Sequence, residues 1–114
     1  MKILFLDDNE AMIGLAKNIF VNKTHNVIIA NNAASAIAIL NHGVDIAVLD
    51  LKLGYGGSVI GVLEKCRKTK TKVYILSGFI SMFNDLLYEY KDIIVSIHHK
   101  PEGVLQVRDA ISML

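Results

Sequence analysis

The spacing of five short apolar runs constrains the fold of this 114-residue chain more than any other feature. Together the runs are rich in β-branched residues, and none alternates apolar with polar residues, which indicates strands buried on both faces. Their first residues lie 24, 19, 27 and 20 positions apart, so the intervals are too long for hairpins and each has room for a crossover helix. The runs span residues 3–6, 27–30, 46–49, 73–76 and 93–97.

The segments between these runs have the periodicity of amphipathic helices. The first has Asn9 as a candidate N-cap, and its apolar face consists of Met12, Leu15, Ala16, Ile19 and Phe20. Five strand–helix units with right-handed crossovers predict a doubly wound α/β fold, in which helices cover both faces of a parallel sheet. The expected helices span residues 10–23, 33–41, 58–68, 80–90 and 102–114.

The composition fits a globular protein that works in a reducing compartment. With 53% hydrophobic residues the chain is too apolar to be disordered, and its length allows it to fold without disulfides. The formal net charge of +1 gives no general attraction to nucleic acids or acidic membranes. Cys66 is the single cysteine, and neither a signal peptide nor a bilayer-spanning run is visible. We therefore expect one cytoplasmic domain over residues 1–114 that contacts neither nucleic acid nor membrane directly.

Polar residues that suit a binding site follow the apolar runs. Asp7 and Asp8 follow the first run, Asp50 follows the third, Ser77 follows the fourth, and Lys100 lies just beyond the fifth. Ligands of open α/β sheets bind beyond the carboxyl ends of the strands, where the strand order reverses. In the order 2-1-3-4-5 that reversal lies between the first and third strands. The three aspartates would then meet there, with the serine and the lysine beside them.

Three carboxylates in one cleft repel one another and need a cation. Lys100 would neutralise one charge, and Mg²⁺ suits the rest because it prefers oxygen ligands and commonly binds phosphates as well. A carboxylate is also a nucleophile toward phosphorus, and a metal ion together with a lysine would stabilise the oxygens of the transferring group. The pattern thus indicates Mg²⁺-assisted phosphoryl transfer to a carboxylate.

These residues resemble the five-point signature of the receiver domains of two-component response regulators, the CheY-like superfamily. The resemblance covers essentially the whole chain, in order and in approximate spacing. It implies a flavodoxin-like three-layer (βα)5 sandwich with the sheet order 2-1-3-4-5. The matching elements are Asp7-Asp8, Asp50 at 42 residues after Asp8, Ser77-Gly78 after a further 27 residues, and Lys100-Pro101.

By position, the resemblance implies a role for each matching residue. Asp50 would accept the phosphoryl group, the Ser77 hydroxyl would hydrogen-bond to it as the switch, and Lys100 would pair with it. The Mg²⁺ ligands would be oxygens of Asp7, Asp8, Asp50 and the backbone carbonyl of Lys52.

The implied function is that of a phosphorylation-switched signalling module. A sensor histidine kinase or a histidine phosphotransfer protein would donate the phosphoryl group. A downstream protein, or a second copy in a homodimer, would bind the face formed by the fourth helix, fifth strand and fifth helix. The chain would be no enzyme beyond its own phosphoryl transfer and autodephosphorylation. With no output domain visible after Leu114, we expect a stand-alone receiver or a fragment of a longer regulator.

Three positions depart from the family pattern. Ile97 replaces the usual aromatic residue three positions before the lysine, Gly54 replaces a common proline after the acceptor, and His98-His99 end the fifth run. Because Ile97 is stiff about its first torsion, we expect the switch to act through the loop that contains Phe79. Gly54 indicates a more flexible loop. Because of these departures, the alternative is a pseudo-receiver, which would bind its partner without phosphorylation.

Other features have both a functional and a structural interpretation. Adjacent strand residues point to opposite faces, so His98 and His99 are not expected to share a metal. The basic segment 65–72 ends an expected helix and is interpreted as a solvated face instead of a nucleic-acid site. Cys66 falls on an apolar helix face and is expected to be inert. A flavodoxin-like electron carrier would need a hydroxyl-rich loop for the FMN phosphate, and residues 7–10 are too acidic for it.

Overall fold

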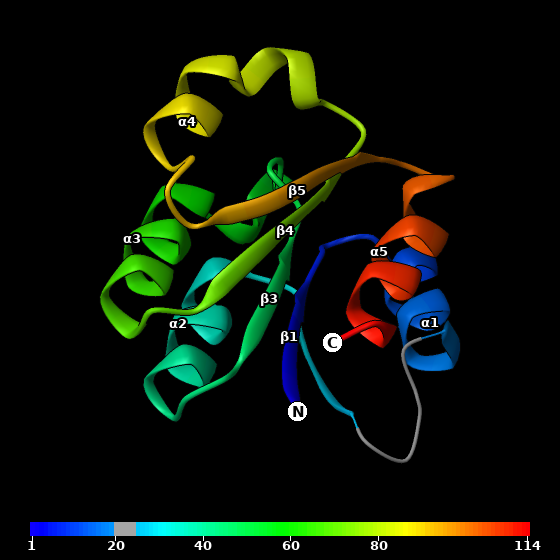
Figure 1. Ribbon diagram of the computed structural model, residues 1–114. Coiled ribbons are helices and arrows are strands. Elements are labelled where there is room, and N and C mark those ends of the chain that lie inside the picture. The colour runs from blue at the N-terminus through cyan, green and yellow to red at the C-terminus, as the bar shows by residue number, and fades with distance from the viewer. Residues whose placement is uncertain (20–24) are drawn as a thin grey trace.

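The structure is a computed structural model that describes residues 1–19 and 25–114. Its centre is a parallel five-stranded sheet with the order β2-β1-β3-β4-β5, which confirms the order implied by the resemblance. Figure 1 shows the strands side by side between two layers of helices. The strands are β1 (Lys2–Leu6), β2 (Asn26–Ala30), β3 (Ile46–Leu49), β4 (Lys72–Ser77) and β5 (Ile94–His99).

Helices cover both faces of this sheet, which confirms the doubly wound α/β sandwich. The helices are α1 (Glu10–Ile19), α2 (Ala33–Asn41), α3 (Val59–Thr69), α4 (Asn84–Glu89) and α5 (Gly103–Ser112). α1 and α5 lie against one face, whereas α2, α3 and α4 lie on the other (Figure 1). Two short 3₁₀ turns, η1 (Gly54–Gly56) and η2 (Ile80–Phe83), precede α3 and α4. None of the described helices is long and apolar enough to cross a membrane.

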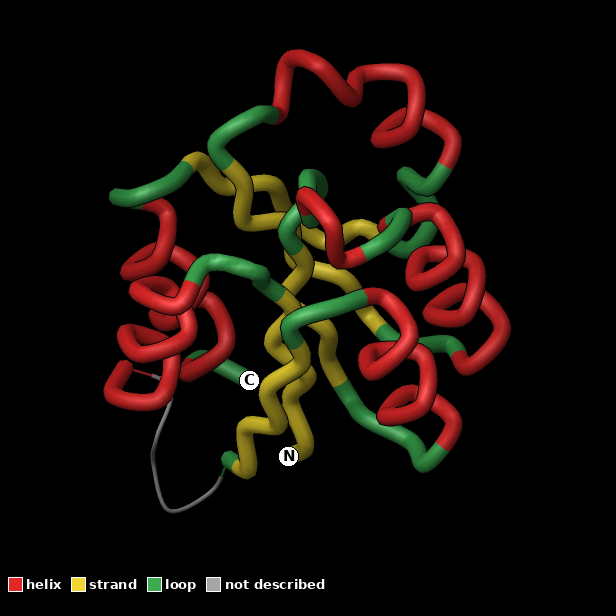
Figure 2. Tube along the Cα trace, turned by 180° about the vertical axis from the view of Figure 1, so that it is seen from behind, coloured by secondary structure: helices red, strands yellow, loops and turns green. Residues whose placement is uncertain are grey.

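Two apolar cores form, one on each face of the sheet, because adjacent residues of a strand point to opposite faces. In β1, Leu4 and Leu6 pack into the core on the α2 and α3 side, whereas Ile3 and Phe5 pack into the core on the α1 and α5 side. This central strand therefore needs apolar residues on both faces, which is why its sequence does not alternate. The carboxyl ends of the parallel strands lie along the edge of the sheet away from the N-terminus (Figure 2).

β5 departs from the prediction that every run is buried on both faces. It is an edge strand with β4 as its one described neighbour, and its residues alternate between half-buried and exposed. Ile97 belongs to the exposed set. The strand also extends beyond the predicted end at residue 97, because His98 and His99 pair with Leu76 and Ser77 of β4.

The segment predicted as one helix over residues 80–90 is divided into η2 and the short α4. None of the η2 residues is fully buried; Ile80 and Phe83 are half-buried and pack against the core on the α2 and α3 side, so the core supports this segment less than it supports the other helices. The apolar periodicity of this segment is real, but only its second half, with Leu87, has a fully buried residue.

The first predicted helix is confirmed as far as Ile19. Phe20 and the rest of the predicted span to residue 23 lie outside the described residues. Asn9 is its cap, as predicted, because the Asn9 side-chain oxygen accepts a hydrogen bond from the Met12 amide at 3.2 Å.

Candidate functional site

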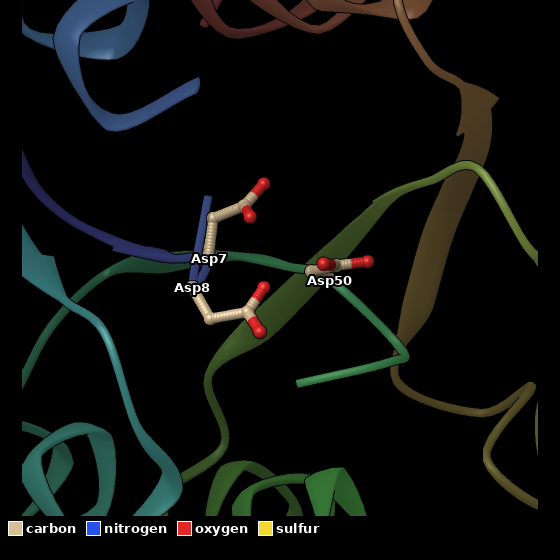
Figure 3. A group of neighbouring side chains, drawn as sticks. All are labelled: Asp7, Asp8 and Asp50. Carbon is tan, nitrogen blue, oxygen red and sulfur yellow. The ribbon is translucent and has the colours of Figure 1, made fainter. Parts of the chain in front are cut away.

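The pairing of β1 with β3 brings the acidic residues together. Leu6 ends β1 and pairs with Leu49, which ends β3, so Asp7 and Asp50 follow at neighbouring strand ends. The Asp50 amide donates to the Leu6 carbonyl at 3.0 Å, which fixes the start of the loop after β3. Figure 3 shows the Asp7 and Asp8 carboxylates projecting toward Asp50, and one oxygen from each of the three lies within 4.8 Å of the others.

Lys100 supplies a positive charge to this acidic cluster, which consists of Asp7, Asp8 and Asp50. Its Nζ lies 2.5 Å from Asp7 Oδ2 and 3.2 Å from Asp50 Oδ2. Asp7 is 1% exposed and Asp50 is 5% exposed, so both charges are removed from bulk water. Burial raises the pKa of Asp7, while its hydrogen bonds with Lys100 and the Asn9 amide act in the opposite direction. One ammonium offsets one of three carboxylates, so the cluster retains negative charge.

Asp50 has a carboxylate oxygen that nothing in the described part of the chain satisfies. Its Oδ2 contacts Lys100, whereas its Oδ1 is buried and has no hydrogen-bond partner among the described residues. Buried polar oxygens are normally hydrogen-bonded, so this one is able to accept a hydrogen bond from water or to bind a metal ion. The three carboxylates also form an all-oxygen donor set, which is the kind of site that fits Mg²⁺.

The loop after β3 approaches the cluster closely at Gly54. A Cβ on Gly54 would lie 2.9 Å from Asp8 Oδ2, so a larger residue would displace that carboxylate. Gly54 also has a φ of 57°, a left-handed conformation that proline, with φ fixed at about −65°, does not adopt. The observed path of the loop at Gly54 is therefore one that proline would not permit. The flexibility of the loop stays a prediction.

Ser77 ends β4 beside Lys100. The Lys100 amide donates to the Ser77 carbonyl at 3.1 Å, and Ser77 is fully buried. The Ser77 Oγ accepts a hydrogen bond from the Phe79 amide at 3.3 Å. A pocket of about 290 Å³ opens at this strand end, and its lining consists of Asp8, Asn9, Asp50, Lys52, Gly54, Gly78, Phe79 and Lys100.

Sequence reasoning missed one contact between two residues that line this pocket. Lys52 Nζ lies 4.4 Å from the centroid of the Phe79 ring, which is the geometry of a cation–π interaction. The two residues belong to different loops, 27 positions apart, and no sequence pattern indicates their contact. The role of the Lys52 backbone carbonyl as a metal ligand stays a prediction.

No family model and no curated protein matches the chain. Its structure is similar to the signal receiver domain of a Vibrio parahaemolyticus protein, with a TM-score of 0.79, 18% identity, and coverage of 98% of this chain and 87% of that one. A response regulator receiver domain protein from Clostridium thermocellum gives a TM-score of 0.78 at 23% identity, with coverage of 97% of this chain and 90% of that one. The receiver domain of Francisella response regulator 1452 gives a TM-score of 0.78 at 23% identity, with coverage of 98% of this chain and 93% of that one. The chain has the receiver fold.

Within this receiver fold, the three residues predicted to form the switch occupy different places. Phe79 lines the pocket, and the buried Ser77 contacts it from the end of β4. Ile97 pairs with Ile75 in the edge strand, is 42% exposed, and does not line the pocket. Phe79 and Ser77 therefore lie beside the acidic cluster, whereas Ile97 lies apart from it.

The features with alternative interpretations lie outside this cluster. His98 hydrogen-bonds to Gln106 of α5 at 2.9 Å, whereas His99 is exposed, so the two rings do not share a site. Cys66 is fully buried, and burial raises its pKa to about 12, which suppresses the reactive thiolate. The solvated-face interpretation of residues 65–72 stays a prediction.

Proposed function

We propose that this chain is a phosphorylation-switched signalling module in which Asp50 accepts a phosphoryl group. The environment of Asp50 carries the proposal. Its Oδ2 is held by Lys100, its Oδ1 is buried without a partner among the described residues, and the residue lines a pocket. A carboxylate oxygen without a hydrogen-bond partner keeps its lone pairs for a metal ion or for attack on phosphorus. The receiver fold supports the same role.

The donor would be a phosphohistidine of a sensor histidine kinase or of a histidine phosphotransfer protein. An oxygen of the Asp50 carboxylate attacks the phosphorus, the phosphorus–nitrogen bond breaks, and the imidazole leaves with the bonding electron pair and takes up a proton. The product is an aspartyl phosphate. Lys100, with Nζ 3.2 Å from Asp50 Oδ2, is close enough to offset the charge of the transferring group.

Mg²⁺ is the cofactor that fits this site. Asp7, Asp8 and Asp50 would hold it, together with the backbone carbonyl of Lys52. When bound, the ion would neutralise negative charge on the phosphoryl oxygens.

The output would be a change in the surface formed by α4, β5 and α5. The Ser77 hydroxyl turns toward the phosphoryl group and releases the Phe79 amide, which shifts the equilibrium between two conformations of that surface. A downstream protein, or a second copy of the chain, binds the favoured conformation. We further propose that residues 1–114 form one receiver domain that acts in the cytoplasm and catalyses only its own phosphorylation and dephosphorylation.

Intact-mass measurement in acetyl phosphate and Mg²⁺ tests the proposal. The wild type should gain the mass of one phosphoryl group and Asp50→Asn should gain none. Asp85→Asn removes an exposed carboxylate of α4 and should label like the wild type. Equal labelling of Asp50→Asn would move the acceptor elsewhere. A wild type that gains no mass and still binds its partner would establish the pseudo-receiver instead.

A further inference from the structure

Phe79 is joined by two contacts to groups beside Asp50. Its backbone amide donates to Ser77 Oγ at 3.3 Å. Its ring faces the Lys52 ammonium, with 4.4 Å between Nζ and the ring centroid. Because the side chain is 46% exposed, these two contacts substitute for much of the core packing that holds buried aromatic residues.

Both contacts involve groups that a phosphoryl group attracts. Phosphorylation adds negative charge and strong acceptor oxygens at Asp50. Lys52 lines the same pocket as Asp50, and its ammonium gains more from a charged partner than from the face of a ring. The Ser77 hydroxyl likewise gains a charged acceptor. Phosphorylation therefore weakens both of these contacts of Phe79.

The segment that follows Phe79 has room to move. η2 begins at Ile80 and has no fully buried residue, although Ile80 and Phe83 are half-buried against the core. A cleft of about 700 Å³ is lined by η2 and the start of α4 on one side, and by the loop after β3 and the start of α3 on the other. Figure 1 shows η2 and α4 arching above the sheet. A shift of this segment would therefore move half-buried side chains at the margin of the core, because none of residues 79–86 is fully buried.

The far end of α4, in contrast, is fixed to α3. Arg67 of α3 donates a hydrogen bond to the Glu89 carbonyl at 2.9 Å. Tyr90 is 2% exposed within the core, and its hydroxyl donates to Glu64. A motion released at Phe79 therefore turns about this end and does not displace the whole helix.

From these contacts we propose that the Lys52–Phe79 pair is a latch that phosphorylation opens. In the phosphate-free protein the ammonium holds the ring and keeps residues 79–86 in the observed position. When Asp50 carries a phosphoryl group, Lys52 turns to it, Ser77 releases the Phe79 amide, and the segment swings about the fixed end of α4. Lys52 is a positioning residue in this scheme, which rests on the proposed phosphorylation of Asp50.

The NMR shifts of the backbone amides of residues 79–86 test the latch. An exposed cation–π pair favours one conformation by about two- to fivefold. Phosphate-free Lys52→Met should therefore move these shifts part of the way toward those of the wild type in acetyl phosphate and Mg²⁺. Lys52→Arg keeps a cation for the ring and should restore the wild-type shifts. Lys91→Met is the matched control, because it breaks the Lys91–Tyr88 pair, 4.1 Å apart and near the other end of α4, and should leave them unchanged.

The latch is wrong if Lys52→Met leaves these shifts unchanged, or if Lys91→Met moves them as far. The intact mass of the same samples separates this result from a failure of the proposed function. If the wild type takes up a phosphoryl group while residues 79–86 stay in place, the latch is excluded, whereas the phosphorylation of Asp50 still stands. If the wild type gains no mass, the proposed function fails and the latch fails with it.

Discussion

Asp7 and Asp50 share one ammonium, because Lys100 Nζ lies 2.5 Å from the first carboxylate and 3.2 Å from the second. Asp8 adds a third carboxylate with an oxygen within 4.8 Å of the others. The charge that remains favours a divalent cation with oxygen ligands. Single substitutions at this strand end should therefore change metal binding and stability together.

Asp8→Asn should weaken Mg²⁺ binding by about tenfold or more, because it removes one of three charged ligand oxygens. The same change should stabilise the metal-free protein, since it relieves repulsion between like charges. NMR shifts at the ends of β1 and β3 during a Mg²⁺ titration measure the affinity, and urea unfolding measures the stability. Asp85→Asn is the control. A wild type that does not respond to millimolar Mg²⁺ would exclude a metal site here.

Gly54→Ala should destabilise the protein by about 1–2 kcal/mol, because the left-handed conformation is strained for a residue with a Cβ. Its Cβ would also press on Asp8 Oδ2, 2.9 Å away, so Mg²⁺ affinity should fall as well. Gly14→Ala, inside α1, meets no atom within 4 Å and should stabilise by about 0.5–1 kcal/mol. Urea unfolding and Mg²⁺ titration of both variants measure these effects. Unchanged Mg²⁺ affinity in Gly54→Ala would show that the close approach to Asp8 is unimportant.

At this scale the sequence indicated the acidic cluster but not the contacts around it. Asp7 and Asp50 come directly after the last residues of two apolar runs, so strand pairing alone brings them together. The Lys52–Phe79 contact depends on the path of two loops and on the rotamers of two exposed side chains. Neither of these is encoded in the spacing of the strands.

Among the elements, β5 and η2 differ from the sequence prediction for the same physical reason. β5 has one described neighbour in the sheet, and η2 is only half covered, with Ile80 and Phe83 against the core but no fully buried residue. Hydrophobic periodicity reports that an apolar face exists, but it does not report whether another element covers that face. The central strands and α3 have such partners, and their predicted positions agree closely with the structure.

Phe79→Ala should reduce the changes in NMR shift that phosphorylation induces in α4, because it removes the side chain that couples the pocket to η2. Ile97→Ala should leave those shifts largely intact, since Ile97 is 42% exposed and does not line the pocket. Both variants are compared with the wild type by NMR at full phosphate uptake, monitored by intact mass. The largest changes around Ile97, with residues 78–84 unmoved, would contradict this route.

The contact between α3 and α4 should weaken at alkaline pH. The hydrogen bond to Glu64, reinforced by burial, raises the pKa of Tyr90 from 10.0 to about 12. The folded protein holds this proton more tightly than the unfolded chain does, so the contribution is complete below about pH 10 and is lost as pH rises through about 12. Tyr90→Phe has no hydroxyl to ionise and should not show this loss. The urea midpoint of the wild type should therefore fall toward that of Tyr90→Phe as the pH rises across this range. A constant difference between the two midpoints would contradict the coupling.

On the scale of the whole molecule, residues far apart in the sequence meet because parallel strands end at one edge of the sheet. Asp7 and Asp50 stand just beyond the ends of their strands (Figure 3). Ser77 ends β4, and Lys100 follows β5. The spacing of the apolar runs was enough to predict a parallel, doubly wound sheet. The strand order was not, because other orders produce the same pattern of runs and helices. It came from the resemblance and is confirmed by the strand pairing.

Whether Asp50 carries the phosphoryl group is tested most directly by reducing the labelled protein with borohydride, which converts an acyl phosphate into an alcohol. After treatment with acetyl phosphate and Mg²⁺, peptide mass spectrometry should find homoserine at position 50 and intact aspartate at Asp7 and Asp8. Homoserine at either of those two positions, with Asp50 unreduced, would contradict the proposed site, and no reduction anywhere would contradict the proposed chemistry.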